Sequence, residues 1–288
     1  MRSRAADAWM RVEAARPRFQ SLDIALLAYD RHRLAAGGLL AGALAFRAFL
    51  WLVPFALITV AGLGFAAAAQ AASPSEIARF GISGQVAQQV ATVASESLRG
   101  RWFTLVIGLF ALVEVSLTAA KGLRVVHAIA WRLPPLGLRR NALAGLAFLA
   151  GATLLVAASA GASWLRAVSP GPGLWVACLV VIVYFAIWLG ASWLLPHAAD
   201  APWTAMIPGA VLFAIGVEAI YLFAVLWLSR EIAHASQTYG SLGVAVSLLG
   251  GLYLFGRLVV ASAMLNASRW EKRLQERRDQ AASFREGE

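Results

Sequence analysis

Charged residues are scarce in this sequence, and their scarcity excludes an ordinary soluble protein. Of the 288 residues, 14% are charged and 60% are hydrophobic. Soluble domains have about 25% charged and about 45–50% apolar residues. The mean hydropathy of +0.69 therefore predicts a membrane protein, and the length leaves no room for a large soluble domain.

Residues that carry enzyme chemistry are also few. The only cysteine, Cys178, excludes an intramolecular disulfide and a cysteine-based metal site. No HExxH, Walker or G-x-S-x-G motif occurs, and the carboxylates outside the apolar segments are too scattered to hold Mg²⁺. The histidines are far apart in the chain: His32, His127, His197 and His234. We therefore expect no enzyme, no cofactor and no bound metal ion.

Long apolar runs make up most of the chain. Each is long enough to cross about 30 Å of hydrocarbon as a helix. The six runs are about 38–69, 102–120, 141–165, 174–195, 205–228 and 241–267. They predict an all-α fold, a polytopic membrane bundle of six transmembrane helices over residues 38–267. A cytoplasmic segment, 1–37, precedes this bundle, and a charged cytoplasmic tail, 268–288, follows it.

Arginine is concentrated on one side of the predicted bundle. It is frequent in residues 1–37, in the loop between the second and third spans, and in the tail. The opposite side has only Arg79, Arg99, Arg101, Arg166 and Arg230. By the positive-inside rule both termini are cytoplasmic, and this asymmetry accounts for the net charge of +10 without a nucleic-acid partner. The N-terminal residues do not have the pattern of a signal peptide.

Two segments outside the spans have helical patterns. Residues 5–33 mix apolar residues with arginines, which predicts an amphipathic helix on the cytoplasmic leaflet, attracted by anionic lipid headgroups. In residues 70–101, Ser73 and Pro74 have the pattern of a helix N-terminus. We expect short extracytoplasmic helices there, between spans one and two, that act as a connector.

Charged side chains also occur within the apolar runs. They are Arg47, Glu114, Glu218 and Arg257. Each costs about 2.5–3.5 kcal/mol at a helix centre, so each needs a partner or a role. Two pairings are open: Glu114 with Arg47 and Glu218 with Arg257, or the crossed arrangement. The charges either form a candidate intramembrane polar site or lock the register of the helices.

Two prolines lie inside or at the edge of spans, at Pro54 and Pro208. Proline removes one backbone hydrogen bond and bends a helix, so both positions are predicted kinks. A kink can serve as a gate, although a static bend is the commoner role in membrane helices.

Stretches in order along the chain carry a family resemblance. They are LAAGGLLAGALAFRAFLWLVPFAL at Leu34–Leu57, HAIAWRLPP with Trp131 and Arg132, WLLPHAADAPWTAMIPGAVLFAIGVEAIY with Pro196, Gly209 and Glu218, and YGSLGVAVSLLGGLYLFGRLVVASAMLNA with Tyr239, Gly240 and Asn266. In motif and spacing they resemble the YihY/BrkB family over nearly the whole chain. One position departs, because Met264 stands where the family usually has glutamate.

The resemblance implies a bacterial inner-membrane protein with six helices. The family has been described as a virulence factor, a transporter and, earlier, a tRNA-processing ribonuclease. A ribonuclease is disfavoured here, because the sequence has no exposed catalytic cluster. The first hypothesis is a transporter or flippase-like protein for an anionic or lipid-like substrate, with the four intramembrane charges around a polar cavity. The second is a structural or envelope-maintenance membrane protein, in which those charges only lock the helices.

Overall fold

The computed structural model describes residues 20–68, 101–134, 142–168, 174–224 and 241–286. These residues form helices and no strand. The helices are α2 (Gln20–Leu34), α3 (Gly37–Ala68), α6 (Arg101–Ala130), α7 (Ala142–Val168), α8 (Leu174–Leu194), the 3-10 helix η2 (Trp203–Met206), α9 (Ile207–Phe223) and α11 (Ser241–Glu286). Six of the helices are long and apolar enough to cross a membrane. The predicted all-α bundle of six spans is therefore confirmed.

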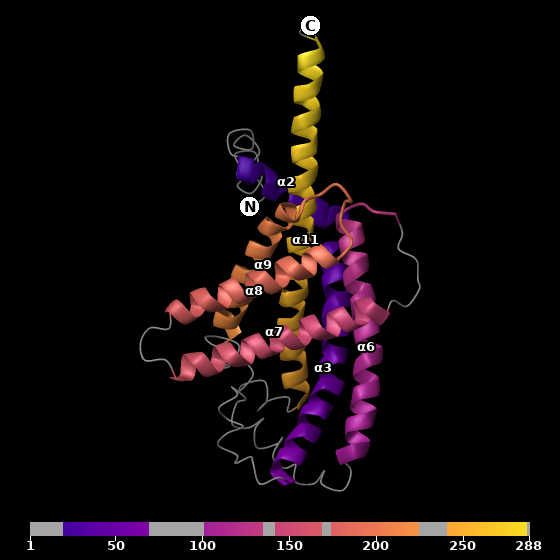
Figure 1. Ribbon diagram of the computed structural model, residues 1–288, viewed down its shortest axis with the longest axis vertical. Coiled ribbons are helices and arrows are strands. Elements are labelled where there is room, and N and C mark those ends of the chain that lie inside the picture. Colours follow the sequence, from indigo (N-terminus) through magenta and orange to yellow (C-terminus); the bar gives the residue numbers. More distant parts are fainter. Residues whose placement is uncertain (1–19, 69–100, 135–141, 169–173, 225–240, 287–288) are drawn as a thin grey trace, which may run out of the picture.

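The helices form two groups that lie at different inclinations (Figure 1). α3 packs between α6 and α11, and these three run along the long axis of the molecule. α7 and α8 run more nearly across that axis, and α9 packs against both α8 and α11. α2 and the end of α11 lie at the same end of the molecule, which we call the α2 end. The opposite end is called the far end.

The second span is longer than the sequence predicted. α6 continues to Ala130 rather than stopping near residue 120, so Lys121 and Arg124 lie on a helix and not in a loop. The reason is that the additional turns are apolar on one face: Val126 and Ala130 are buried against neighbouring helices. A single lysine did not end the helix, because the side chain of Lys121 is exposed.

The tail extends the sixth span as one helix. α11 has 46 residues, which at 1.5 Å per residue is about 70 Å, more than twice the thickness of a hydrocarbon core. Its last turns stand clear of the bundle (Figure 1). The residues of the charged tail therefore continue the sixth span as helix as far as Glu286.

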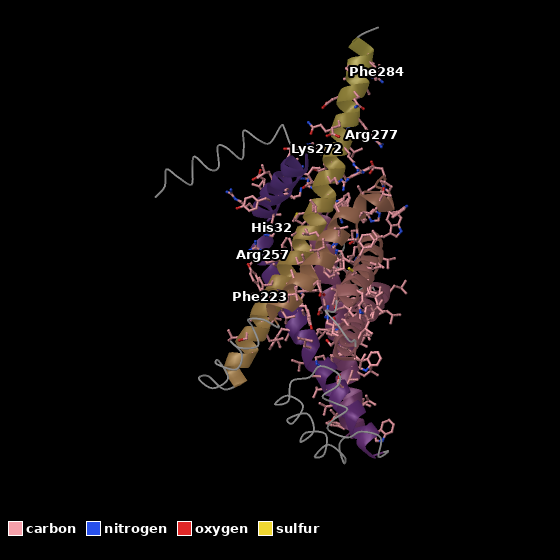
Figure 2. The ribbon with its side chains drawn as sticks, turned by 90° about the vertical axis from the view of Figure 1, so that its left-hand side faces the viewer. His32, Phe223, Arg257, Lys272, Arg277 and Phe284 are labelled. Atoms are coloured by element: carbon pink, nitrogen blue, oxygen red, sulfur yellow. The ribbon has the colours of Figure 1, made fainter. Side chains whose placement is uncertain are left out.

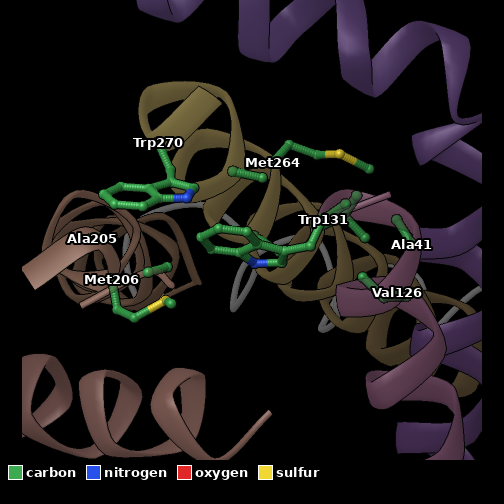
Figure 3. Close-up of a cluster of buried hydrophobic side chains, with 12 residues drawn as sticks. Ala41, Val126, Trp131, Ala205, Met206, Met264 and Trp270 are labelled. Carbon is green, nitrogen blue, oxygen red and sulfur yellow. The ribbon is translucent and has the colours of Figure 1, made fainter. Parts of the chain in front are cut away.

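A cluster of buried apolar side chains closes the α2 end (Figure 3). α3, the end of α6, η2 and α11 meet there. Labelled members are Ala41, Val126, Trp131, Ala205, Met206, Met264 and Trp270. Met264 has no exposed surface. The position where the family usually has glutamate is therefore part of the apolar core in this chain.

The two prolines have different positions. Pro54 lies inside α3, where its effect as a kink stays a prediction. Pro208 is in the first turn of α9, directly after η2. Backbone N–H groups of a first turn have no partner within the helix, so proline costs no helical hydrogen bond there. Pro208 lies in the first turn of α9, and a bend at this position stays a prediction.

Some predictions fall outside the described residues. They concern residues 1–19, the short helices expected in 70–101, and the family positions Tyr239 and Gly240. They stay predictions.

Candidate functional site

A cavity of about 920 Å³ lies between the two groups of helices. Residues of α3, α6, α7, α8, α9 and α11 line it. Its volume is within the range of small-molecule sites, about 300–1,000 Å³. Most of the wall is apolar, including Leu44, Leu123, Phe148, Leu155, Trp188 and Phe255. The cavity can therefore hold a largely hydrocarbon molecule.

Two arginines, Arg47 of α3 and Arg124 of α6, also line the cavity. Arg47 donates a hydrogen bond to the carbonyl oxygen of Thr118, across the α3–α6 contact. Gly122 makes this approach feasible, because a Cβ there would lie 2.7 Å from Arg47 Nη1. Among the described residues, no carboxylate lines the wall. Since arginine stays protonated, the cavity is cationic on this side.

Aromatic rings surround His197 where the cavity approaches the α2 end. His197 lines the cavity together with Trp193 and Pro196. The His197 ring lies 4.7 Å from that of Trp193 and 6.2 Å, edge-on, from that of Trp131. Its Nδ1 lies 2.8 Å from the Leu195 carbonyl oxygen. The family positions Pro196 and Trp131 therefore belong to one aromatic cluster beside the cavity.

The opposite part of the wall carries hydroxyl groups. Ser159 of α7 and Tyr184 of α8 line the cavity, and their oxygens lie 2.7 Å apart. In the last turn of α7, Arg166 forms an ion pair with Glu218 of α9, with Nη2 and Oε1 2.6 Å apart. The guanidinium of Arg166 also lies 4.0 Å from the centre of the Tyr221 ring. Arg166 and Glu218 are not part of the cavity lining.

The four predicted intramembrane charges are not gathered at one site. Arg47 lines the cavity. Glu218 pairs with Arg166, so both pairings proposed for Glu218 from the sequence are wrong. Arg257 is exposed on α11, where Nη1 lies 3.5 Å from the Tyr253 hydroxyl. Figure 2 shows Arg257 close to His32 of α2, outside the cavity.

Glu114, the fourth charge, is half-buried on α6 and is not among the residues that line the cavity. Arg124 and Arg166 are the two charged residues that sequence reasoning missed. From the sequence, both are expected outside the spans, because each lies at the edge of an apolar run. The helical spacing of Val126 and Ala130 after Arg124 was the available signal for a longer helix.

Two family positions meet in a direct hydrogen bond away from the cavity. The backbone N–H of Gly209 donates to Asn266 Oδ1 at 2.6 Å, and both groups are buried. A Cβ at Gly209 would lie 2.5 Å from Asn266 Nδ2, so glycine permits α9 and α11 to approach this closely. Arg132, another family position, has φ of 51° and lies 3.6 Å from Glu271. These positions join helices rather than forming the cavity.

Comparison with known proteins supports the resemblance seen in the motifs. The family model described as Virulence factor BrkB matches residues 28–286. Neither a curated protein nor a solved structure matches the chain. The match includes the second half of α2, all six apolar helices and the extension of α11. The chain therefore belongs to the virulence factor BrkB family of membrane proteins.

Proposed function

We propose that this protein is a transporter or flippase-like protein for an amphipathic anion, which binds in the cavity between the two groups of helices. One observation carries the proposal: two arginines and no described carboxylate line a mostly apolar wall. The anionic group of the substrate contacts Arg47 and Arg124, and its hydrocarbon part lies against Leu123, Phe148 and Leu155.

Physical chemistry supports this assignment in two ways. An arginine held in an apolar region without a carboxylate is costly, and an anionic ligand reduces that cost. Guanidinium groups bind carboxylate or phosphate through paired hydrogen bonds, which favours such anions over neutral molecules. The apolar wall adds about 25 cal/mol for each Å² of hydrocarbon removed from water.

The proposal also specifies the membrane in which the protein lies and its orientation there. The protein lies in the bacterial inner membrane with both termini in the cytoplasm, because the α2 end is rich in arginine. Anionic lipid headgroups contact this end. The activity is movement of a molecule, with no catalytic reaction, cofactor, metal ion or nucleic acid involved.

The orientation can be tested by labelling. In a Cys178→Ser background, the Ser283→Cys protein should react with a membrane-impermeant maleimide only after the cells are opened.

A structural or envelope-maintenance role is the second candidate. It is favoured by the closed ion pair between Arg166 and Glu218 and by the buried contact between Gly209 and Asn266. In that case the charges hold helices together, and the cavity has no transported occupant.

Reconstituted vesicles test the proposal. Purified protein is placed in vesicles with fluorescent phosphatidylglycerol or, as a zwitterionic control, fluorescent phosphatidylcholine, and reduction by external dithionite reports lipid movement. Uptake of labelled inorganic phosphate is measured separately, to detect a water-soluble anion. We expect Arg47→Gln with Arg124→Gln to reduce anion movement at least tenfold. Arg257→Gln removes one positive charge outside the cavity and should leave anion movement unchanged.

The opposite results contradict the proposal. A wild-type protein that moves neither the anionic lipid nor phosphate would leave the structural role as the better explanation. Equal rates for the cavity variant and the Arg257 variant would remove the assigned role of the two arginines.

A further inference from the structure

The ion pair between Arg166 and Glu218 is held from several sides. The pair is 2.6 Å long, and the two side chains are 19% and 12% exposed. The ring of Tyr221, on α9, lies 4.0 Å from the guanidinium of Arg166 and holds this guanidinium against α9. The second carboxylate oxygen of Glu218 is buried and has no hydrogen-bond partner among the described residues. Glu218 is thus attached to the rest of the described structure mainly through Arg166.

A buried ion pair of this kind is weak evidence for stability, because the loss of hydration offsets the attraction between the charges. A bundle of apolar helices could be closed at this place by hydrocarbon side chains alone. A cation retained here at the cost of desolvation is therefore a candidate for a functional role.

The ion pair lies close along the chain to residues of the cavity wall, on α7 and on α9. Ser159 lines the cavity, and Arg166 is seven residues later on α7, two turns along the same face. On α9, the cavity residue Val217 directly precedes Glu218. Ala162, which lies between Ser159 and Arg166 on α7, is small and belongs to the same buried cluster as Ala214 of α9. The hydroxyls of Ser159 and Tyr184, which lie 2.7 Å apart, are polar groups of the cavity wall on α7 and α8.

We propose that Arg166 is a second anion-binding residue, and that the Glu218 carboxylate occupies it when no ligand is present. This inference rests on the proposed function, since it assigns a second cationic position to the same anion. The anion binds first at Arg47 and Arg124. It then displaces Glu218 from Arg166, in the last turn of α7.

The carboxylate of Glu218 resembles the anionic group that it would give way to. A carboxylate on a neighbouring helix neutralises Arg166 in the empty protein and lowers its affinity for incoming anions. The ligand class is therefore a molecule with one compact anionic group, a phosphate or a carboxylate, that can form the same paired hydrogen bonds. Tyr221 keeps the guanidinium in place during the exchange, through a cation–π contact.

Binding stoichiometry tests this site independently of transport. Hexyl phosphate is titrated into the purified full-length protein in detergent by calorimetry, and inorganic phosphate is titrated in a parallel series. We expect one hexyl phosphate per wild-type protein at moderate concentration and two per Glu218→Gln protein. Arg166→Gln combined with Glu218→Gln should return the number to one. If inorganic phosphate gives the same numbers, the anionic group alone is recognised. If it does not, the alkyl chain is required.

Two further variants separate binding from a structural role. Arg166→Glu with Glu218→Arg keeps an ion pair but moves the cation to α9, so it should retain thermal stability and bind only one hexyl phosphate. Arg47→Gln with Arg124→Gln in the Glu218→Gln protein should remove the first site and keep the second. If Glu218→Gln does not fold, the wild-type protein still offers a test. At high ligand concentration it should show a second site at least tenfold weaker than the first, and the charge-exchanged protein should lack it.

The failures of the two proposals are distinguishable. One bound anion in both the wild-type and Glu218→Gln proteins, with no weaker second site, overturns the role of Arg166. Two bound anions in Glu218→Gln without lipid or phosphate movement in vesicles leaves Arg166 as an anion site and rejects transport.

Discussion

At the scale of single residues, helix contacts in this protein depend on positions where no side chain can be added. Gly209 is the clearest case, because its N–H and its missing Cβ both face Asn266 and the backbone of Ser262. Elsewhere a helical glycine has open space around it, as at Gly190. The two kinds of position should respond differently to the same substitution.

We predict that Gly209→Ala destabilises the protein by about 1–3 kcal/mol, the usual cost of adding atoms to a packed interior. The added Cβ would lie 2.5 Å from Asn266 Nδ2 and also against the Ser262 carbonyl, which is helix backbone. Unfolding of the purified protein in detergent measures the effect. Gly190→Ala is the matched control and should be neutral or slightly stabilising, because alanine favours helix. Equal stabilities of the two variants would contradict the close contact.

His32 gives a pH dependence at the residue scale. Burial, and then repulsion from Arg257, lower the pKa of His32 from its ordinary value of 6.5. Its Nδ1 is buried without a hydrogen-bond partner among the described residues. The unfolded state therefore binds a proton more readily than the folded state below pH 6.5. The stabilising effect of neutral His32 is complete above pH 6.5 and is lost as the pH falls through the lowered pKa.

We predict that α2 becomes less protected against hydrogen exchange between pH 7.5 and 5.5, after correction for the intrinsic exchange rates. His32→Gln cannot be protonated and should remove most of this change. A wild-type protein with the same corrected protection at both pH values would show that His32 is not the titrating group.

At the scale of elements, α2 is attached to the extension of α11 by charged side chains. Arg31, which is 8% exposed, donates to Glu271 and, at 3.0 Å, to the Ala130 carbonyl at the end of α6. Lys272 pairs with Asp23, which lies about two turns before Arg31 on α2. This attachment was absent from the sequence-based picture, which placed the N-terminal helix on lipid headgroups. Contact of this region with lipid stays a prediction.

We predict that Glu271→Gln loosens α2 and lowers its hydrogen-exchange protection about tenfold. A hydrogen bond between charged groups contributes about 1.5–3 kcal/mol, and a tenfold change needs about 1.4 kcal/mol. The effect is expected because Arg31 is left buried without its carboxylate. Asp279→Asn removes an exposed carboxylate from the same helix and should leave α2 unchanged. Equal exchange in both variants would show that the ion pairs do not hold α2.

At the scale of the whole molecule, the inclination of α7 and α8 relative to α3, α6 and α11 determines where the cavity lies (Figure 1). Small residues of α7, such as Gly151 and Ala152, line the cavity. On another side of the same helix, Leu154 is 52% exposed. One face of α7 thus lines the cavity, and another face is exposed on the surface of the bundle.

We predict that Ala152→Trp abolishes anion movement in vesicles, because the indole fills part of the cavity. Folding should be retained, since the cavity has room for the added atoms. Leu154→Trp adds a large side chain two residues away on the exposed face, and should leave movement unchanged. Unchanged movement in the Ala152 variant, at wild-type stability, would exclude this cavity as the route.

The sequence by itself determined the class of the protein and the location of most helices. Length and apolar composition are enough to recognise a membrane span. The reason is that a single segment in hydrocarbon can satisfy all its backbone hydrogen bonds only by forming a helix. The family could also be recognised, from short motifs in order. The residues at which spans end were less predictable. A charged residue such as Lys121 marks the end of a helix only when the residues after it are not buried against neighbouring helices.

Only the tertiary structure decided which charges meet. Arg47 and Arg124 share a cavity, Glu218 pairs with Arg166, and Arg257 lies outside, although Arg47, Glu218 and Arg257 have similar apolar surroundings in the sequence. The physical reason is that pairing depends on the rotation and inclination of each helix, which local hydrophobicity does not encode. For the same reason, the contact between Gly209 and Asn266, 57 residues apart, appears only when α9 and α11 pack together.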